Sequence, residues 1–214
     1  MANPAELLHA TLARWSSDQH YPDPADHRTA VRHLDAIEEL LGQMDDVGLK
    51  TDVFRRHFIK WSTLTLRHPN DWGTQTAQKL TDTAALEHLE NLAEWFRTLV
   101  PTVMGDGLDQ IRRYVDGVRD LLDVDDSLDP LLKQHAKQVI AHLIWCVDNY
   151  DAVGDFDLQA AMERLIATMV RSAGASDKRD RWRDLLNGFV YPFGTQVAAA
   201  IPAQALIQLA LGGG

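Results

Sequence analysis

Cysteine is almost absent from the sequence, with Cys146 as the one thiol among 214 residues. A single thiol cannot form an intramolecular disulfide, and a structural zinc site normally needs several cysteines. Cys146 lies within an apolar helical pattern, so we expect a buried core thiol in a reduced, cytoplasmic protein. The first fifteen residues have no basic start and no long apolar run, so we expect no signal peptide.

Short motifs that carry known chemistry are also lacking. The chain has no G-x-S-x-G elbow and no Gly-rich phosphate loop, and its VDDSLD stretch departs from the EF-hand pattern. One Glu-x-x-His pair, Glu6 and His9, is present where a di-iron bundle needs two. We therefore expect no cofactor and no metal site, and we favour a protein that is not an enzyme.

Positive charge is scarce, since 21 Lys and Arg stand against 31 Asp and Glu and give a formal net charge of −10. Proteins that bind nucleic acids place clustered Lys and Arg against the phosphates. The charge balance therefore argues against a nucleic-acid partner.

The charges are unevenly distributed along the chain. Residues 50–68 contain five basic residues and one acid, whereas residues 105–129 contain eight aspartates and three arginines. One interpretation is that both segments form solvated faces, which would contribute little to stability. Our hypothesis is that they meet across a subunit contact. The residues that would form this contact are Arg55, Arg56, Asp123, Asp125 and Asp126.

Helical periodicity is present almost throughout. Residues 108–122 show it most clearly, with apolar side chains spaced three and four apart, and no segment sustains the period-two alternation of a strand. The pattern predicts an all-α fold: a multi-helix bundle of about eight or nine helices, mostly antiparallel neighbours, with a C-terminal apolar helix. Three Asx-Pro pairs mark helix starts, namely Asn3-Pro4, Asp23-Pro24 and Asp129-Pro130.

Few segments resemble boundaries between domains. YDAVGDFD, residues 150–157, predicts a break between two helices. We expect a bundle over residues 1–194 with a soft boundary near residue 105, although one continuous bundle is equally compatible with the pattern. Residues 195–214 form a separate apolar helix and glycine tail in this prediction.

Charge is absent from the last thirty residues, 185–214. Within them, residues 197–211 form a predicted helix of about 22 Å, short of the roughly 30 Å of a bilayer core. Membrane contact is thus less favoured than burial in the bundle or in a subunit interface. A self-association contact would use Val197, Ile201, Leu206 and Leu209.

One class of helical enzyme remains as an alternative. HEPN-type ribonucleases are small helical bundles with an Arg-x(4–6)-His motif, in which the arginine steadies a phosphate and the histidine moves protons. Arg28 and His33 match this spacing, as do Arg14 and His20. The arginine and histidine content of the chain predicts about as many matches by chance.

The stretch from Leu128 to Arg183 reads LDPLLKQHAKQVIAHLIWCVDNYDAVGDFDLQAAMERLIATMV and continues into a charged RDRW segment. It resembles a loose group of helical bacterial proteins from mobile-element and phage-defence neighbourhoods. The resemblance implies a setting in bacterial or phage defence and implies no catalytic residues.

The sequence thus predicts a non-enzymatic helical interaction protein that self-associates, with another protein as a second candidate partner. Two alternatives remain open: a small HEPN-like ribonuclease, and an effector that perturbs membranes with its C-terminal helix.

Overall fold

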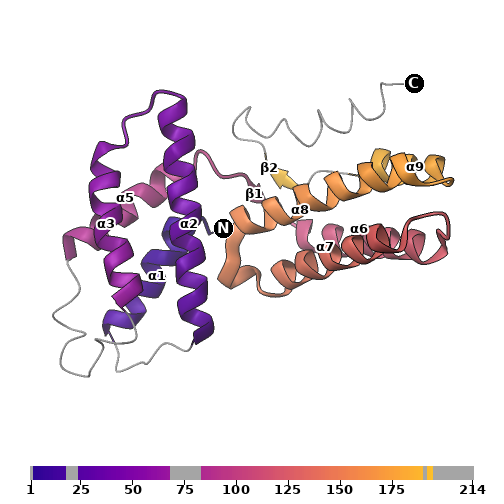
Figure 1. Ribbon diagram of the computed structural model, residues 1–214. Helices are drawn as coiled ribbons and strands as arrows, with labels where there is room; N and C mark the ends of the chain where they lie inside the picture. Colours follow the sequence, from indigo (N-terminus) through magenta and orange to yellow (C-terminus); the bar gives the residue numbers. More distant parts are fainter. Residues whose placement is uncertain (1, 18–23, 68–82, 190–191, 195–214) are drawn as a thin grey trace. The chain divides into compact units, whose positions relative to one another are not determined.

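The computed structural model describes residues 2–17, 24–67, 83–189 and 192–194. These residues form eight helices and one pair of two-residue strands, which confirms the predicted all-α fold (Figure 1). The chain is organised into two compact units. The N-terminal unit comprises Ala2–Val100 and Asp151–Phe156, and the C-terminal unit comprises Pro101–Tyr150 and the chain from Asp157 onward.

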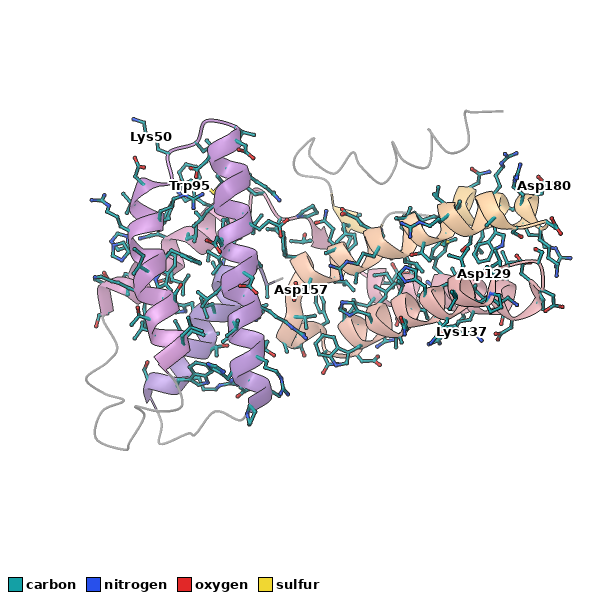
Figure 2. All side chains as sticks on the ribbon, viewed as in Figure 1. Lys50, Trp95, Asp129, Lys137, Asp157 and Asp180 are labelled. Carbon is teal, nitrogen blue, oxygen red and sulfur yellow. The ribbon has the colours of Figure 1, made fainter. Side chains whose placement is uncertain are left out.

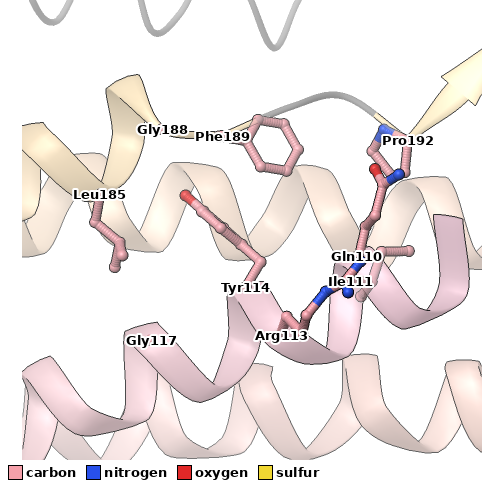
Figure 3. Close-up of a pocket in the computed structure, with 9 residues that line it drawn as sticks. All are labelled: Gln110, Ile111, Arg113, Tyr114, Gly117, Leu185, Gly188, Phe189 and Pro192. Carbon is pink, nitrogen blue, oxygen red and sulfur yellow. The ribbon is translucent and has the colours of Figure 1, made fainter. Parts of the chain in front are cut away.

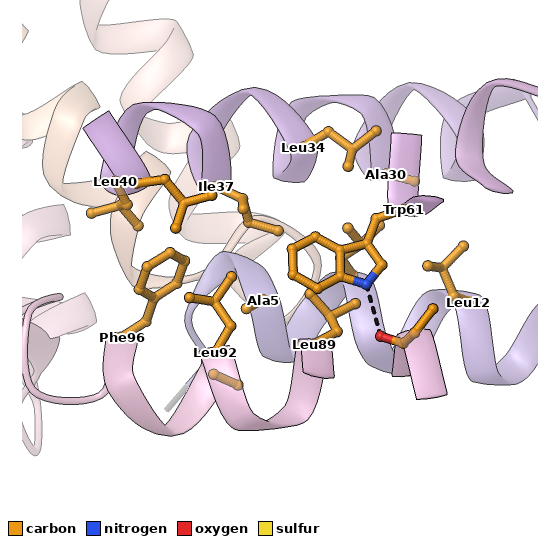
Figure 4. Close-up of a cluster of buried hydrophobic side chains, with 14 of the residues drawn as sticks. Ala5, Leu12, Ala30, Leu34, Ile37, Leu40, Trp61, Leu89, Leu92 and Phe96 are labelled. Atoms are coloured by element: carbon orange, nitrogen blue, oxygen red, sulfur yellow. Dashed lines mark hydrogen bonds between the residues drawn. The ribbon is translucent and has the colours of Figure 1, made fainter. Parts of the chain in front are cut away.

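Four helices build the N-terminal unit, and α1 and α3 each pack against both α2 and α5. Their apolar faces share one core, in which Trp61 is fully buried and donates its indole N–H to the carbonyl of Ala85 at 2.7 Å (Figure 4). Burying each large apolar side chain contributes roughly 1.5–3 kcal/mol. The helices are α1 (Pro4–Ser17), α2 (Pro24–Asp46), α3 (Asp52–Arg67) and α5 (Thr83–Phe96).

Asn3 starts α1 as its sequence predicts. The Asn3 side-chain oxygen accepts hydrogen bonds from the backbone N–H groups of Ala5 and Glu6, both at 3.1 Å. The Glu6 carboxylate in turn accepts from the Asn3 backbone N–H at 3.0 Å, which completes a capping box. The Asn3 amide nitrogen also donates to the carbonyl of Ala93 at 2.9 Å, so the same residue ties α1 to α5.

The predicted break at residues 150–157 is confirmed, because two helices meet there at a kink within α8 (Tyr150–Ala175). The interruption is confined to Gly154, whose φ of 75° lies in the left-handed region. A Cβ at Gly154 would lie 2.4 Å from the carbonyl oxygen of Ala2, so a side chain cannot fit there. The backbone N–H of Asp155 donates to that same oxygen at 3.2 Å.

The C-terminal unit contains α6, α7, most of α8, and α9. Asp129 caps α7, since its carboxylate accepts from the N–H groups of Leu131 and Leu132, as the Asp-Pro pair predicts (Figure 2 labels Asp129). Cys146 is fully buried on α7, which confirms the predicted core thiol. The remaining elements are α6 (Gly107–Val124), α7 (Pro130–Asp148), α9 (Arg179–Asn187), β1 (Thr102–Val103) and β2 (Phe193–Gly194).

Candidate interaction site on the C-terminal unit

A pocket of about 410 Å³ lies between α6 and the end of α9. Figure 3 shows the aromatic rings of Tyr114 and Phe189 side by side in its middle, with Pro192 toward one end and Leu185 toward the other. Its volume is typical of pockets that enclose a small ligand or a few anchoring side chains. The residues that line it are Gln110, Ile111, Arg113, Tyr114, Gly117, Leu185, Gly188, Phe189 and Pro192.

Tyr114 is fixed in the wall of this pocket. Its ring centroid lies 4.8 Å from that of Phe189, and its hydroxyl donates to the sulfur of Met169 at 3.2 Å. Burial raises the pKa of the Tyr114 hydroxyl well above its ordinary value of 10.0. The side chain is therefore neutral at physiological pH and serves as an apolar surface with one satisfied polar end.

The polar side chains of the pocket lie on α6, and both contact the carboxylate of Asp106. The Gln110 amide donates to the Asp106 carboxylate at 2.7 Å, and the Arg113 guanidinium lies 3.5 Å from the same carboxylate. The Arg113 side chain is 70% exposed. The site thus combines an apolar wall with a polar rim, which is the usual composition of a protein-binding patch.

The two short strands hold residues 193–194 against the segment that directly precedes α6. Val103 pairs with Phe193 and Thr102 with Gly194 in antiparallel register, and the Met104 N–H donates to the Pro192 carbonyl at 3.0 Å. Phe193 is 2% exposed. Sequence periodicity missed this pair, because two residues are too few to show an alternation.

Asp125 is a structural residue, contrary to its assignment to a surface contact. It is fully buried, and its carboxylate accepts from the Ser127 and Ser176 hydroxyls at 2.6 and 2.5 Å and from the Trp182 indole at 2.7 Å. Burial alone would raise the pKa of Asp125, but these hydrogen bonds outweigh it and hold the pKa well below its ordinary range. The ionised carboxylate therefore joins the α6–α7 loop to the start of α9.

The other residues of the proposed charge contact have counter-charges or acceptors within their own units. The Nε of Arg55 lies 2.7 Å from Asp45, and the Nε of Arg56 donates to the Asp52 carbonyl at 3.3 Å. Asp123 pairs with Lys137 at 3.1 Å, and Asp126 with Lys133 at 3.7 Å (Figure 2 labels Lys137). These pairs reduce the charge that each segment presents to a partner, and the charge contact between the segments stays a prediction.

The structure does not bring Arg28 and His33 together as a catalytic pair. Both lie on α2, but Arg28 is exposed whereas His33 is 2% exposed among core residues. Burial lowers the pKa of His33 from 6.5 to about 4, against a hydrogen bond with the Ala152 backbone that acts in the opposite direction. A buried, neutral imidazole without access to solvent is poorly placed to bind RNA or exchange protons with it.

The four apolar contact residues Val197, Ile201, Leu206 and Leu209 lie outside the described residues, as does His20. Within the described part of the chain, no three His, Cys, Asp or Glu side chains gather in a way that could hold a metal ion. None of the helices in that part combines the length and the apolar character needed to cross a membrane.

Comparison of the chain with protein families, curated proteins and solved structures found no match.

Proposed function

We propose that this protein is a helical interaction protein that self-associates through its uncharged C-terminal segment, residues 197–211. The observation that carries the proposal is the coincidence of two complementary features in one chain. The C-terminal unit has a pocket with an apolar wall, and the chain continues from Pro192 of that pocket into twenty-two residues without charge. Transfer of an apolar segment out of water lowers the free energy, and a pocket of this kind can bury part of that segment.

The setting that we propose is bacterial or phage defence, in the cytoplasm. Support for this setting comes from the resemblance of Leu128 to Arg183 to proteins of defence neighbourhoods. An interaction protein needs a surface for assembly and no catalytic motif, and none of the catalytic motifs considered above occurs in the sequence.

The test is the oligomeric state of the full-length protein, measured by light scattering coupled to size-exclusion chromatography over a wide concentration range. The wild type should form a discrete oligomer, and the double variant Ile201→Asp/Leu206→Asp should be monomeric. Gln134→Asp/Gln138→Asp is the matched control, since it adds the same charge on exposed positions of α7 and should assemble normally. A wild-type protein that stays monomeric at every concentration would refute the proposal.

A further inference from the structure

The path of the chain past the pocket restricts where the C-terminal segment can go. Pro192 lines the pocket, and its carbonyl accepts a hydrogen bond from Met104. From there the chain runs antiparallel to β1, so that Gly194 pairs with Thr102. The pocket residues on α6 begin at Gln110, and α6 follows β1 in the chain. Because β2 is antiparallel to β1, β2 runs away from α6.

This direction disfavours entry of the segment into the pocket of its own chain. Each strand residue advances the chain by about 3.3 Å, so at Gly194 it is moving along β1 and away from the start of α6. To fill its own pocket, the chain would have to reverse direction at some point after Gly194. A neighbouring molecule can present the same segment without that reversal.

The chemistry of the pocket suits such a segment. Its wall consists of the aromatic and aliphatic side chains of Tyr114, Phe189 and Leu185, and the C-terminal segment contributes Val, Ile and Leu without a charge that burial would penalise. An amphipathic helix docks in a groove through a few anchors spaced three or four residues apart. Ile201 and Ala205, or Leu206 and Leu209, have this spacing.

We propose that the pocket between α6 and α9 of one copy receives residues 197–211 of a second copy, and that the exchange is reciprocal. This inference rests on the proposed self-association and adds the surface at which it occurs. A reciprocal exchange produces a closed dimer with two identical contacts, which is the commonest form of homo-oligomer.

The first test blocks the pocket in the full-length chain. Gln110→Trp places a large side chain at the rim, and should raise the dissociation constant of the dimer by about thirtyfold or more, as expected for loss of an interface anchor. Asp120→Trp is the control, because it puts the same side chain on an exposed position of α6 outside the pocket lining and should leave the dimer unchanged. Circular dichroism and thermal melting establish that both variants are folded.

A milder variant gives a graded response. A Cβ at Gly117 would lie 3.2 Å from the Leu185 side chain, so Gly117→Ala narrows the pocket and shifts Leu185 by a few tenths of an ångström. The dissociation constant should rise by less than for Gln110→Trp. An unchanged dimer in both pocket variants would overturn the proposal and leave the proposed function standing.

Mixing the two kinds of variant tests the exchange itself. Gln110→Trp keeps an intact segment, and Ile201→Asp/Leu206→Asp keeps an intact pocket. A mixture should therefore form a heterodimer with one contact, at concentrations at which each variant alone is monomeric. Absence of this heterodimer would show that the segment occupies the pocket of its own chain or another surface, and would overturn the proposal. A monomeric wild type, in contrast, would refute the proposed function itself.

Discussion

The two units each bury an ionisable side chain and treat its charge in opposite ways. In the N-terminal unit His33 is 2% exposed and is held neutral, because burial lowers its pKa to about 4. In the C-terminal unit Asp125 is fully buried, yet its pKa is held below the ordinary range and the carboxylate is ionised. The number of hydrogen-bond donors around each group accounts for the difference.

Burial disfavours charge at both sites, and only Asp125 has enough donors to reverse that effect. Its two oxygens accept four hydrogen bonds, from the backbone and side chain of Ser127 and from the side chains of Ser176 and Trp182. His33 has its hydrogen bond with the Ala152 backbone to set against burial. The core of the N-terminal unit thus holds a neutral imidazole at His33, whereas the C-terminal unit holds a charged carboxylate within a network of four hydrogen bonds.

The largest effect should follow removal of that network. Asp125→Ala leaves the Ser176 hydroxyl and the Trp182 indole buried without their acceptor, and should lower the free energy of unfolding of the C-terminal unit by about 4 kcal/mol. Asp126→Ala changes the neighbouring residue, whose side chain is 96% exposed, and should have no measurable effect. Urea denaturation followed by the amide exchange of peptides from each unit measures the change. Equal effects of the two substitutions would contradict the structural role of Asp125.

Acid should destabilise the two units in different pH ranges. The folded-state pKa of His33 lies below its ordinary value of 6.5, so the unfolded chain binds more protons between pH 6.5 and about 4. The N-terminal unit should lose up to about 3 kcal/mol of stability as the pH falls through that range. The pKa of Asp125 is lowered from 3.8, so its contribution to the C-terminal unit is present above pH 3.8 and is lost only in stronger acid.

Hydrogen exchange of peptides from each unit, measured between pH 7 and pH 4 and corrected for intrinsic rates, tests this order. His33→Gln should flatten the pH dependence of the N-terminal unit, whereas His135→Gln, at an exposed position on α7, should leave it unchanged. If the C-terminal unit loses its protection from exchange before the N-terminal unit as the pH falls, the predicted order is wrong.

Features that depend on near neighbours in the sequence were predictable. The capping box of Asn3 and Glu6 and the cap at Asp129 involve residues two or three positions apart, so their spacing alone identifies them. The helical spacing of residues 108–122 predicted α6 in the same way. Each of these features is decided within one turn of helix.

Features that depend on distant residues were not predictable. Asp125 is one of eight aspartates in its segment, and its partners Ser176 and Trp182 lie 51 and 57 positions away. Nothing in the local pattern distinguishes it from Asp123 or Asp126. The pocket was missed for the same reason, since Tyr114 and Phe189 meet only when α6 packs against α9.

The smallest effect should come from salt. The basic segment belongs to the N-terminal unit and the acidic segment to the C-terminal unit, but Arg55 pairs with Asp45 and Asp123 with Lys137 inside their own units. If the dimer forms through the apolar segment, raising sodium chloride from about 0.1 M to about 1 M should change its dissociation constant by no more than about threefold, because screening acts on exposed charges alone.

The double substitution Arg55→Ala/Arg56→Ala removes two basic charges from the protein instead of screening them with salt. The dissociation constant of the dimer should again be almost unchanged. Sedimentation equilibrium of the wild type and the double variant at both salt concentrations measures this. A tenfold or greater weakening by salt that disappears in the double variant would restore the charge contact between the segments. The salt dependence thus decides whether the two units differ only in how they fold, or also contribute opposite charges to the assembly.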